Sequence, residues 1–201
     1  ILIADKFEAF GIAELKKIAT EVTCEPDLKD ATLTKRVAEF DPAVLIVRST
    51  KVNAGTLQAG KQLKVVIRAG SGYDTIDVAA AKQRGIKVSN CPGMAAVAVA
   101  ELVMGHMINL DRRIADNVAE LRAHKWNKKE FNKARGLKGS TLGIVGLGRI
   151  GMEVAKRALA FDMHVLWYDV VPNLKGPDHP KARRVELDEL FKQSDYVTLH
   201  V

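Results

Sequence analysis

The sequence predicts an α/β protein with two doubly wound parallel-sheet domains. Three observations support this: short apolar runs alternate with amphipathic helical segments from residue 1, the alternation breaks near Gly93, and it resumes at Thr141. Such alternation is typical of parallel sheets covered by helices on both faces. We therefore expect one domain over residues 1–92 and a second over residues 93–201.

The elements of the first domain follow from its apolar patterns. Strands are predicted in ILIAD, AVLIVRS, LKVVIRAG and IKVSN, and helices in EAFGIAELKKIAT, TLTKRVAEF and DVAAAKQRG. In the last helix Asp77 is a suitable N-cap and Gly85 a suitable C-terminal stop.

The second domain begins with helices. After NCPG, two helical stretches run to about Trp126, and the apolar segment 94–110 contains Glu101 and His106. It is too short for a membrane span and predicts a buried helix. Beyond a basic loop we expect a strand over 141–145, a helix over 151–160, a strand over 164–168, a helix in LDELFKQS and a terminal strand.

Composition narrows the function classes. The 201 residues are 47% hydrophobic and 27% charged, which is ordinary for a soluble globular protein. A net charge of +7 suits an anionic small substrate. Because no aromatic platform or nucleic-acid motif accompanies the basic residues, we expect no nucleic-acid partner. Two separated cysteines and no signal peptide indicate a reducing, cytoplasmic location without a membrane partner. A start without methionine and a stop inside a strand-like run suggest a fragment.

A glycine loop carries the strongest single motif. Gly146, Gly148 and Gly151 form G-x-G-x-x-G between the strand STLGIV and the helix GMEVAKRAL, which is the placement a dinucleotide site requires. The first glycine allows a tight turn, the second lets backbone N–H groups approach a pyrophosphate, and the third lets helix and strand pack closely. The pyrophosphate would lie at the helix N-terminus.

An acidic residue completes the motif. Asp169 ends the next strand, where a carboxylate can accept hydrogen bonds from the adenosine ribose hydroxyls. It would repel a 2′-phosphate, and no arginine follows it in DVVPNLKG. The sequence therefore predicts NAD rather than NADP as the cofactor.

Several segments together resemble a known family. VRSTKV, RAGSGYDTIDVAAAKQRGIKVSNCPG, AEL and LKGSTLGIVGLGRIGMEVAKRALAFDM occur in the order found in the D-isomer-specific 2-hydroxyacid dehydrogenases, with most similarity to the phosphoglycerate dehydrogenases. The resemblance implies a flavodoxin-like substrate-binding domain over residues 1–92, of which this is the N-terminal part. It also implies an incomplete Rossmann NAD-binding domain over residues 93–201.

The resemblance assigns roles to individual residues. It implies substrate binding by Arg48 and Ser49, which end a predicted strand, and by the loop Gly70, Ser71 and Gly72, whose N–H groups suit an anion-binding nest. It also implies cofactor contacts by Ser71, by the glycine loop with the backbone of Arg149 and Ile150, and by Val201. Lys128 corresponds to a basic residue that reaches a neighbouring subunit's substrate. Met94, Ala95 and Ala96 depart from the polar residues usual after the hinge proline.

No catalytic residue is assigned. The family's arginine, glutamate and histidine (lysine in some members) are expected beyond residue 201. Among the five histidines, His200 is best placed, at the carboxyl end of a strand, and fits a wall of the cofactor pocket better than a proton donor. His106 is expected in the core and His124 at the surface. No cluster has metal-ligand spacing, so no metal is expected.

Three functions remain open at this stage. The first is NAD-dependent oxidation of 3-phosphoglycerate to 3-phosphohydroxypyruvate, the entry to serine biosynthesis. The second is reduction of glyoxylate, hydroxypyruvate or another small 2-keto acid, and the third is an NAD(H)-sensing regulator similar to corepressors of this fold. The apolar helices over residues 95–126 predict a homodimer.

Overall fold

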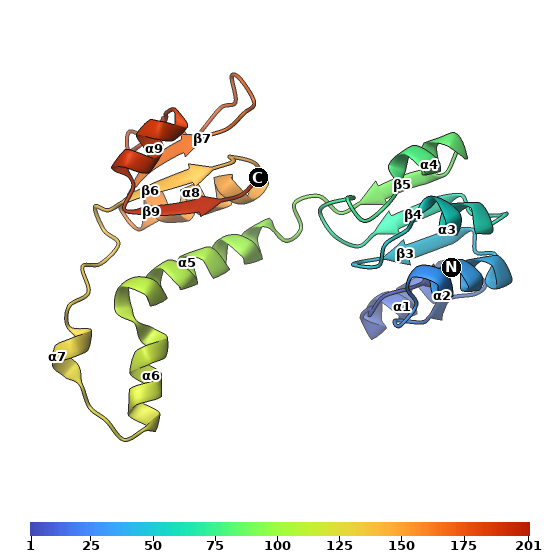
Figure 1. The fold of residues 1–201 in the computed structure, drawn as a ribbon, viewed down its shortest axis with the longest axis horizontal. Helices are drawn as coiled ribbons and strands as arrows, with labels where there is room; N and C mark the ends of the chain where they lie inside the picture. The colour runs from blue at the N-terminus through green and yellow to red at the C-terminus, as the bar shows by residue number, and fades with distance from the viewer. The chain divides into compact units, whose positions relative to one another are not determined.

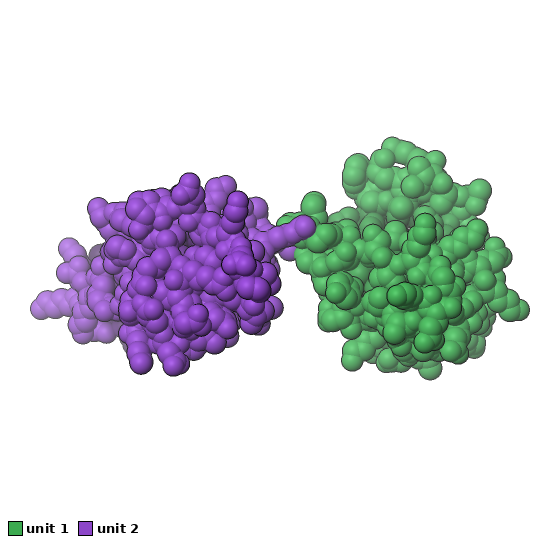
Figure 2. Space-filling model, turned by 90° about the horizontal axis from the view of Figure 1, so that it is seen from above, with its two compact units in different colours: residues 1–94 green, residues 95–201 purple.

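The computed structural model describes all of residues 1–201, with the elements labelled in Figure 1. The chain divides into two compact units, residues 1–94 and residues 95–201, which are coloured separately in Figure 2. Each unit has its own parallel sheet and its own apolar core.

The first unit is built on a five-stranded sheet. Its strands are β1 (Leu2–Ile3), β2 (Thr23–Cys24), β3 (Val44–Val47), β4 (Val65–Arg68) and β5 (Lys87–Asn90), all parallel, in the order β2-β1-β3-β4-β5. The strand order reverses around β1 and β3. In open α/β sheets, ligands bind at the carboxyl ends of the strands beside such a switch point.

Four helices pack around this sheet: α1 (Ala9–Ile18), α2 (Asp30–Phe40), α3 (Ala54–Ala59) and α4 (Val78–Gln83). Helix α3 contacts both α2 and α4, so these three lie in a row. The predicted boundaries of α4 are confirmed. Asp77 accepts a 2.9 Å hydrogen bond from the N–H of Ala80, and Gly85 ends the helix with a φ of +68°.

The second unit has a four-stranded sheet. Strands β6 (Thr141–Val145), β7 (His164–Tyr168), β8 (Ala182–Arg184) and β9 (Tyr196–Leu199) are parallel, in the order β8-β7-β6-β9. Numbered from β6, this is the 3-2-1-4 order of the Rossmann fold. The predicted bounds of β6 and β7 are confirmed, whereas β8 was not predicted.

Its helices are α5 (Ala96–Arg112), α6 (Ile114–Arg122), α7 (Lys128–Phe131), α8 (Arg149–Ala160) and α9 (Leu187–Gln193). Helices α5 and α8 pack together on one side of the sheet, and α9 covers the other, against β6 and β7 (Figure 1). The first turn of α8 thereby lies beside the end of β6, where the glycine loop leaves the sheet.

Helix α5 is less buried than the sequence predicted. One face, with Ala100, Met104 and Met107, joins the core, whereas Leu102 and Leu110 are 59% and 67% exposed. The expectation that His106 lies in the core is wrong, because it is on the exposed side, whereas His124 is exposed as expected. No helix is both long and apolar enough to cross a membrane.

Candidate functional site

A cavity of about 310 Å³ opens at the carboxyl ends of β6, β7 and β9. Ligand pockets in proteins begin at about this volume. The structure brings five of the predicted cofactor residues to it from three separate segments. It is lined by Val145, Gly146, Gly148, Tyr168, Asp169, Val170, His200 and Val201.

Glycine stands at each of the three positions of the loop for a different physical reason. Gly146 has a φ of +89°, and a side chain there would strike the backbone carbonyl of His200. At Gly151 a Cβ would collide with the carbonyl oxygen of Gly146, so helix α8 could not approach the loop. A Cβ at Gly148 would meet nothing within 4 Å. The protein's own packing therefore requires glycine at 146 and 151, while Gly148 leaves a bare backbone facing open space, as close approach of a pyrophosphate demands.

Helix α8 begins directly at this opening. Gly148 is its N-cap, and the N–H of Met152 donates a 2.9 Å hydrogen bond to the Gly148 carbonyl. The N–H groups of a first helical turn have no partner inside the helix and carry partial positive charge, which favours an anion there. The side chain of Ile150 is partly buried against the core of the unit.

Asp169 is held rigidly at the far end of the cavity. Its Oδ2 accepts a 2.8 Å hydrogen bond from the N–H of Leu147, and its Oδ1 accepts one of 2.8 Å from the N–H of Val171. These two donors, with a smaller contribution from the charge of Arg184, hold the pKa of the Asp169 carboxyl below its usual range. The carboxylate is therefore ionised at neutral pH. Each of its oxygens keeps a lone pair for a ribose hydroxyl.

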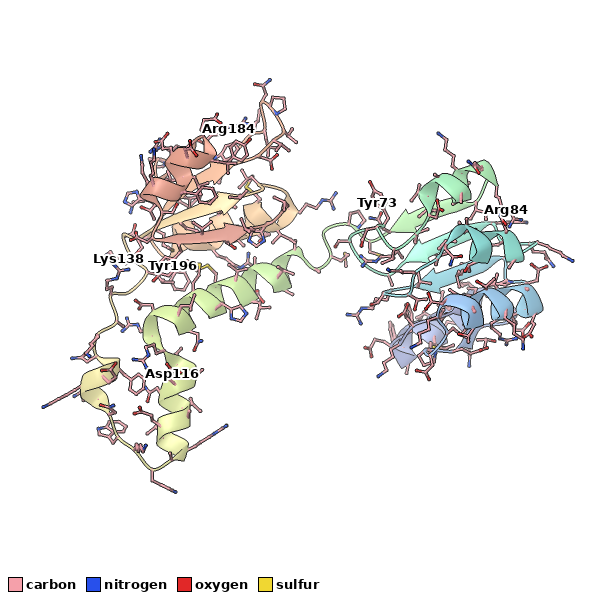
Figure 3. The ribbon with its side chains drawn as sticks, viewed as in Figure 1. Tyr73, Arg84, Asp116, Lys138, Arg184 and Tyr196 are labelled. Atoms are coloured by element: carbon pink, nitrogen blue, oxygen red, sulfur yellow. The ribbon has the colours of Figure 1, made fainter.

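An arginine that sequence reasoning missed lies beside this carboxylate. Arg184 ends β8, and its Nη2 donates hydrogen bonds to the carbonyls of Asp169, at 2.8 Å, and Val171, at 3.2 Å. Figure 3 labels it next to the loop that follows β7. The statement that no arginine follows Asp169 holds for the adjacent sequence but not in space, because parallel pairing places Arg184 opposite Trp167.

His200 closes another wall of the cavity. Its Nε2 lies 2.9 Å from the hydroxyl of Thr198, and burial lowers the pKa of its imidazole. The ring is therefore neutral at pH 7. A neutral, hydrogen-bonded imidazole suits a pocket wall, and no proton transfer is assigned to it.

The first unit gathers polar residues at the carboxyl edge of its own sheet. Asp5 follows β1, and its Oδ2 accepts hydrogen bonds from the N–H groups of Arg48, Ser49 and Thr50, at 2.6, 3.1 and 3.1 Å. The backbone donors of this loop are thus occupied by a carboxylate of the same chain. The side chains of Arg48 and Ser49 are exposed and are what the loop offers a ligand.

The neighbouring loop, Gly70 to Gly72, is fixed through its carbonyl groups. The N–H of Cys91 donates to the Gly70 carbonyl at 2.9 Å, and the Asn90 side chain donates to the Ser71 carbonyl at 2.6 Å. The N–H groups of Ser71 and Gly72 have no partner within the described chain. Two consecutive free N–H groups are what an anion-binding nest requires.

Arg68 links the two loops and was not singled out from the sequence. Its Nε donates to the Arg48 carbonyl at 2.9 Å, and its Nη1 lies 3.4 Å from the Gly72 carbonyl. A Cβ at Gly70 would strike its guanidinium, so glycine there lets the arginine lie flat against the loop. Tyr73, 60% exposed, lies at the same edge of the sheet in Figure 3. The position of Arg68 at the end of a strand was the available signal.

The predicted sites therefore fall into two groups. Arg48, Ser49 and the Gly70–Gly72 loop, which includes Ser71, belong to the first unit, whereas the glycine loop, Asp169, His200 and Val201 belong to the second. The second group fits NAD. The unhindered Gly148 and the N-terminus of α8 suit the pyrophosphate, and the ionised carboxylate of Asp169 suits the hydroxyls of the adenosine ribose. NAD bound there would supply a hydride acceptor.

Comparison with known proteins agrees with this geometry. Residues 104–201 match the D-isomer specific 2-hydroxyacid dehydrogenase, NAD binding domain. A hydroxypyruvate reductase of Thermotoga maritima is 50% identical over 93% of this chain and 59% of its own length. A D-3-phosphoglycerate dehydrogenase of Methanocaldococcus jannaschii is 39% identical over 100% of this chain and 38% of its own length.

A solved structure gives the same result. The NAD-dependent formate dehydrogenase of Staphylococcus aureus in complex with NAD superposes with a TM-score of 0.81, at 27% identity, over 100% of this chain and 64% of that one. The chain thus spans less than two thirds of each of these proteins. The match covers the cavity-bearing unit, so the second unit of this chain is an NAD-binding domain of the D-isomer-specific 2-hydroxyacid dehydrogenases.

Proposed function

We propose that this chain binds the cofactor and the substrate of an NAD-dependent dehydrogenase that converts 3-phosphoglycerate to 3-phosphohydroxypyruvate, a reaction of serine biosynthesis. The first unit, with its flavodoxin-like strand order, is then the substrate-binding domain, and the second is an incomplete Rossmann domain. The residues named here bind and orient the reactants, and the proposal assigns them no proton transfer.

The observation that carries the proposal is the pairing of a nest with cations at one sheet edge. The free N–H groups of Ser71 and Gly72 suit a carboxylate, while the exposed Arg48 side chain suits a second anionic group. Arg68, anchored to both loops, adds a further positive charge. Two sites for anions match a substrate that carries both a carboxylate and a phosphate.

The second candidate is reduction of hydroxypyruvate or glyoxylate. The observation that favours it is the 50% identity to a hydroxypyruvate reductase. Such substrates carry one anionic group, so the nest alone would serve them and Arg48 would contribute little.

The experiment compares 3-phosphohydroxypyruvate, hydroxypyruvate and glyoxylate as oxidants of NADH, followed at the nicotinamide absorbance band in the full-length protein. The leading proposal expects the highest kcat/KM with 3-phosphohydroxypyruvate. Turnover of only the unphosphorylated acids would overturn it in favour of the second candidate. Turnover of none would favour the NAD(H)-sensing regulator.

Arg48 supplies the matched variant. Arg48→Gln should raise KM for 3-phosphohydroxypyruvate by about tenfold or more and change KM for glyoxylate much less, because a charge-assisted contact to phosphate is lost. Lys51→Gln, an exposed neighbour on the same loop, is the control. Equal effects of Arg48→Gln on both substrates would argue against a phosphate contact.

We further propose a homodimer formed through the helices over residues 95–126. Helix α6 has no buried residue within its unit, and its stripe of Ile114, Val118 and Leu121 is 47%, 41% and 46% exposed. Apolar residues at i, i+4 and i+7 line one face of a helix, and a second copy would cover them. Lys128 begins α7 close by in the sequence and is exposed, in keeping with a role toward a neighbouring subunit.

A cytoplasmic location is part of the same proposal.

A further inference from the structure

Two opposite charges, the carboxylate of Asp169 and the guanidinium of Arg184, lie close enough to influence each other at the edge of the cofactor cavity. Asp169 lines the cavity, and Arg184 does not. The two residues are 15 positions apart in sequence and meet because β7 and β8 pair in parallel, Trp167 opposite Arg184. The guanidinium of Arg184 also lies over the Trp167 ring, 5.4 Å from its centroid.

Arg184 is only partly engaged in this position. Its Nη2 donates two hydrogen bonds, to the carbonyls of Asp169 and Val171. Its Nε and Nη1 have no hydrogen-bond partner in the described chain, and the residue is exposed. A guanidinium with free donors is the side chain best suited to a phosphate. Its stacking on Trp167 holds it in place without using those donors.

The two charges act in opposite directions on a cofactor with a 2′-phosphate. The ionised carboxylate of Asp169 repels that group and accepts hydrogen bonds from the bare ribose hydroxyls. The guanidinium of Arg184, bonded to the carbonyls of Asp169 and Val171 but absent from the lining of the cavity, would attract the same phosphate. Selectivity for NAD therefore depends on the carboxylate and not on the absence of a cation.

We propose that Arg184 is a latent 2′-phosphate-binding residue, and that Asp169 alone keeps the site selective for NAD over NADP. Loss of the carboxylate is then sufficient to admit NADP, because Arg184 is already in place to bind the 2′-phosphate. A neutral residue at 169 leaves the Arg184 bonds to the main chain intact, since these use the carbonyl groups and not the carboxylate.

The test is a double-mutant cycle measured by calorimetric titration of NADH and NADPH, with no keto acid present, so it is independent of the substrate proposal. Asp169→Ser should raise NADPH affinity by about tenfold or more, because a repulsive charge is removed and a charge-assisted contact becomes possible. Asp169→Ser with Arg184→Gln should lose most of that gain. Asp169→Ser with Arg184→Lys should keep a larger part of it, since the charge remains.

Arg183→Gln is the matched control. Arg183 is the neighbouring exposed arginine of β8, but its guanidinium pairs with Glu189 and Gln193 of α9. In the Asp169→Ser background it should leave NADPH affinity unchanged. Thermal unfolding of each variant establishes that it folds. The proposal is overturned if Asp169→Ser gains no NADPH affinity, or if adding Arg184→Gln leaves the gain intact.

Discussion

The carboxylate of Asp169 accepts a 2.8 Å hydrogen bond from the N–H of Leu147, between the first two glycines of the motif. Asp169, which is expected to bind the ribose, therefore also fixes the loop that is expected to bind the pyrophosphate. Two parts of the cofactor site that are 22 positions apart in sequence are thus mechanically joined.

This link predicts a combined defect for Asp169→Ala. The N–H groups of Leu147 and Val171 lose their acceptor, so their amide hydrogen exchange should accelerate, and NADH affinity should fall about tenfold or more as the ribose contact is lost. Exchange measured by mass spectrometry and affinity measured by calorimetry check the two effects. Slow exchange at both amides in the variant would contradict the structural part.

Alanine substitutions at Gly146 and Gly148 should separate an effect on stability from an effect on NADH binding. Gly146→Ala places a Cβ against the His200 carbonyl at a positive φ and should destabilise the second unit by about 2 kcal/mol or more. The Cβ that Gly148→Ala adds meets no atom of the protein, so the free energy of unfolding of this variant should stay within about 0.5 kcal/mol of the parent's. It should nevertheless bind NADH far more weakly. Urea unfolding and NADH titration make the comparison, and unimpaired binding by Gly148→Ala would count against the pyrophosphate assignment.

Asp5 gives a prediction for the first unit alone. Asp5→Ala leaves three backbone N–H groups without their acceptor and should lower the free energy of unfolding by about 1–3 kcal/mol. Both tryptophans, Trp126 and Trp167, lie in the second unit. The urea transition followed by circular dichroism should therefore begin earlier, while the tryptophan fluorescence transition stays near its parent midpoint. A fluorescence transition shifted as far as the dichroism signal would show that the effect is not confined to the first unit.

The exposed stripe on α6 tests the dimer proposal. Val118→Asp puts a charge into the centre of the apolar face and should convert a dimer to monomers at micromolar concentration, read by sedimentation or light scattering. Ala119→Asp adds the same charge away from the stripe and should leave the dimer intact. A monomeric parent protein, or dissociation by both variants alike, would refute the assigned interface.

His200 contributes a pH dependence of stability. Burial lowers the pKa of its imidazole in the folded state, so below about pH 6.5 the unfolded chain binds a proton that the folded chain resists. Stability should therefore decline as the pH falls from about 6.5 towards the folded pKa, and His200→Asn should lack this decline. Thr198→Val removes the hydroxyl partner but not the burial and should retain it. Unfolding midpoints between pH 5 and 8 provide the measurement.

The parts of the fold that were predictable are those determined by local pattern. The runs TLGIV and HVLWY are almost wholly apolar, and they became β6 and β7 with the expected bounds. Strand β8 is only ARR, with both arginines exposed, so no apolar pattern marks it. Its pairing with β7 is set by the sheet and not by its own sequence. The same reason hid Arg184 from the sequence analysis.

The sequence also predicted poorly which side chains of the helices are buried. The apolar content of α5 suggested burial all round, but burial depends on what packs against each face. Only the side that contacts α8 is covered within the unit, which leaves Leu102, His106 and Leu110 exposed. Likewise, Arg68 and Asp5 acquire their roles from contacts with Arg48, which lies 20 and 43 positions away. Such partners become visible only when parallel strands align their ends.

The engagement of Asp5 with the loop after β3 has a bearing on how substrate range can diverge. Because a resident carboxylate fixes the main chain of residues 48–50, the shape of that loop does not depend on an incoming anion. The exposed side chains of Arg48 and Ser49 are then free to contact a ligand, because the loop is held by its main chain and not by them. Exchanging them should leave the main chain of the loop unchanged, so this edge is the place to alter which anions the first unit accepts.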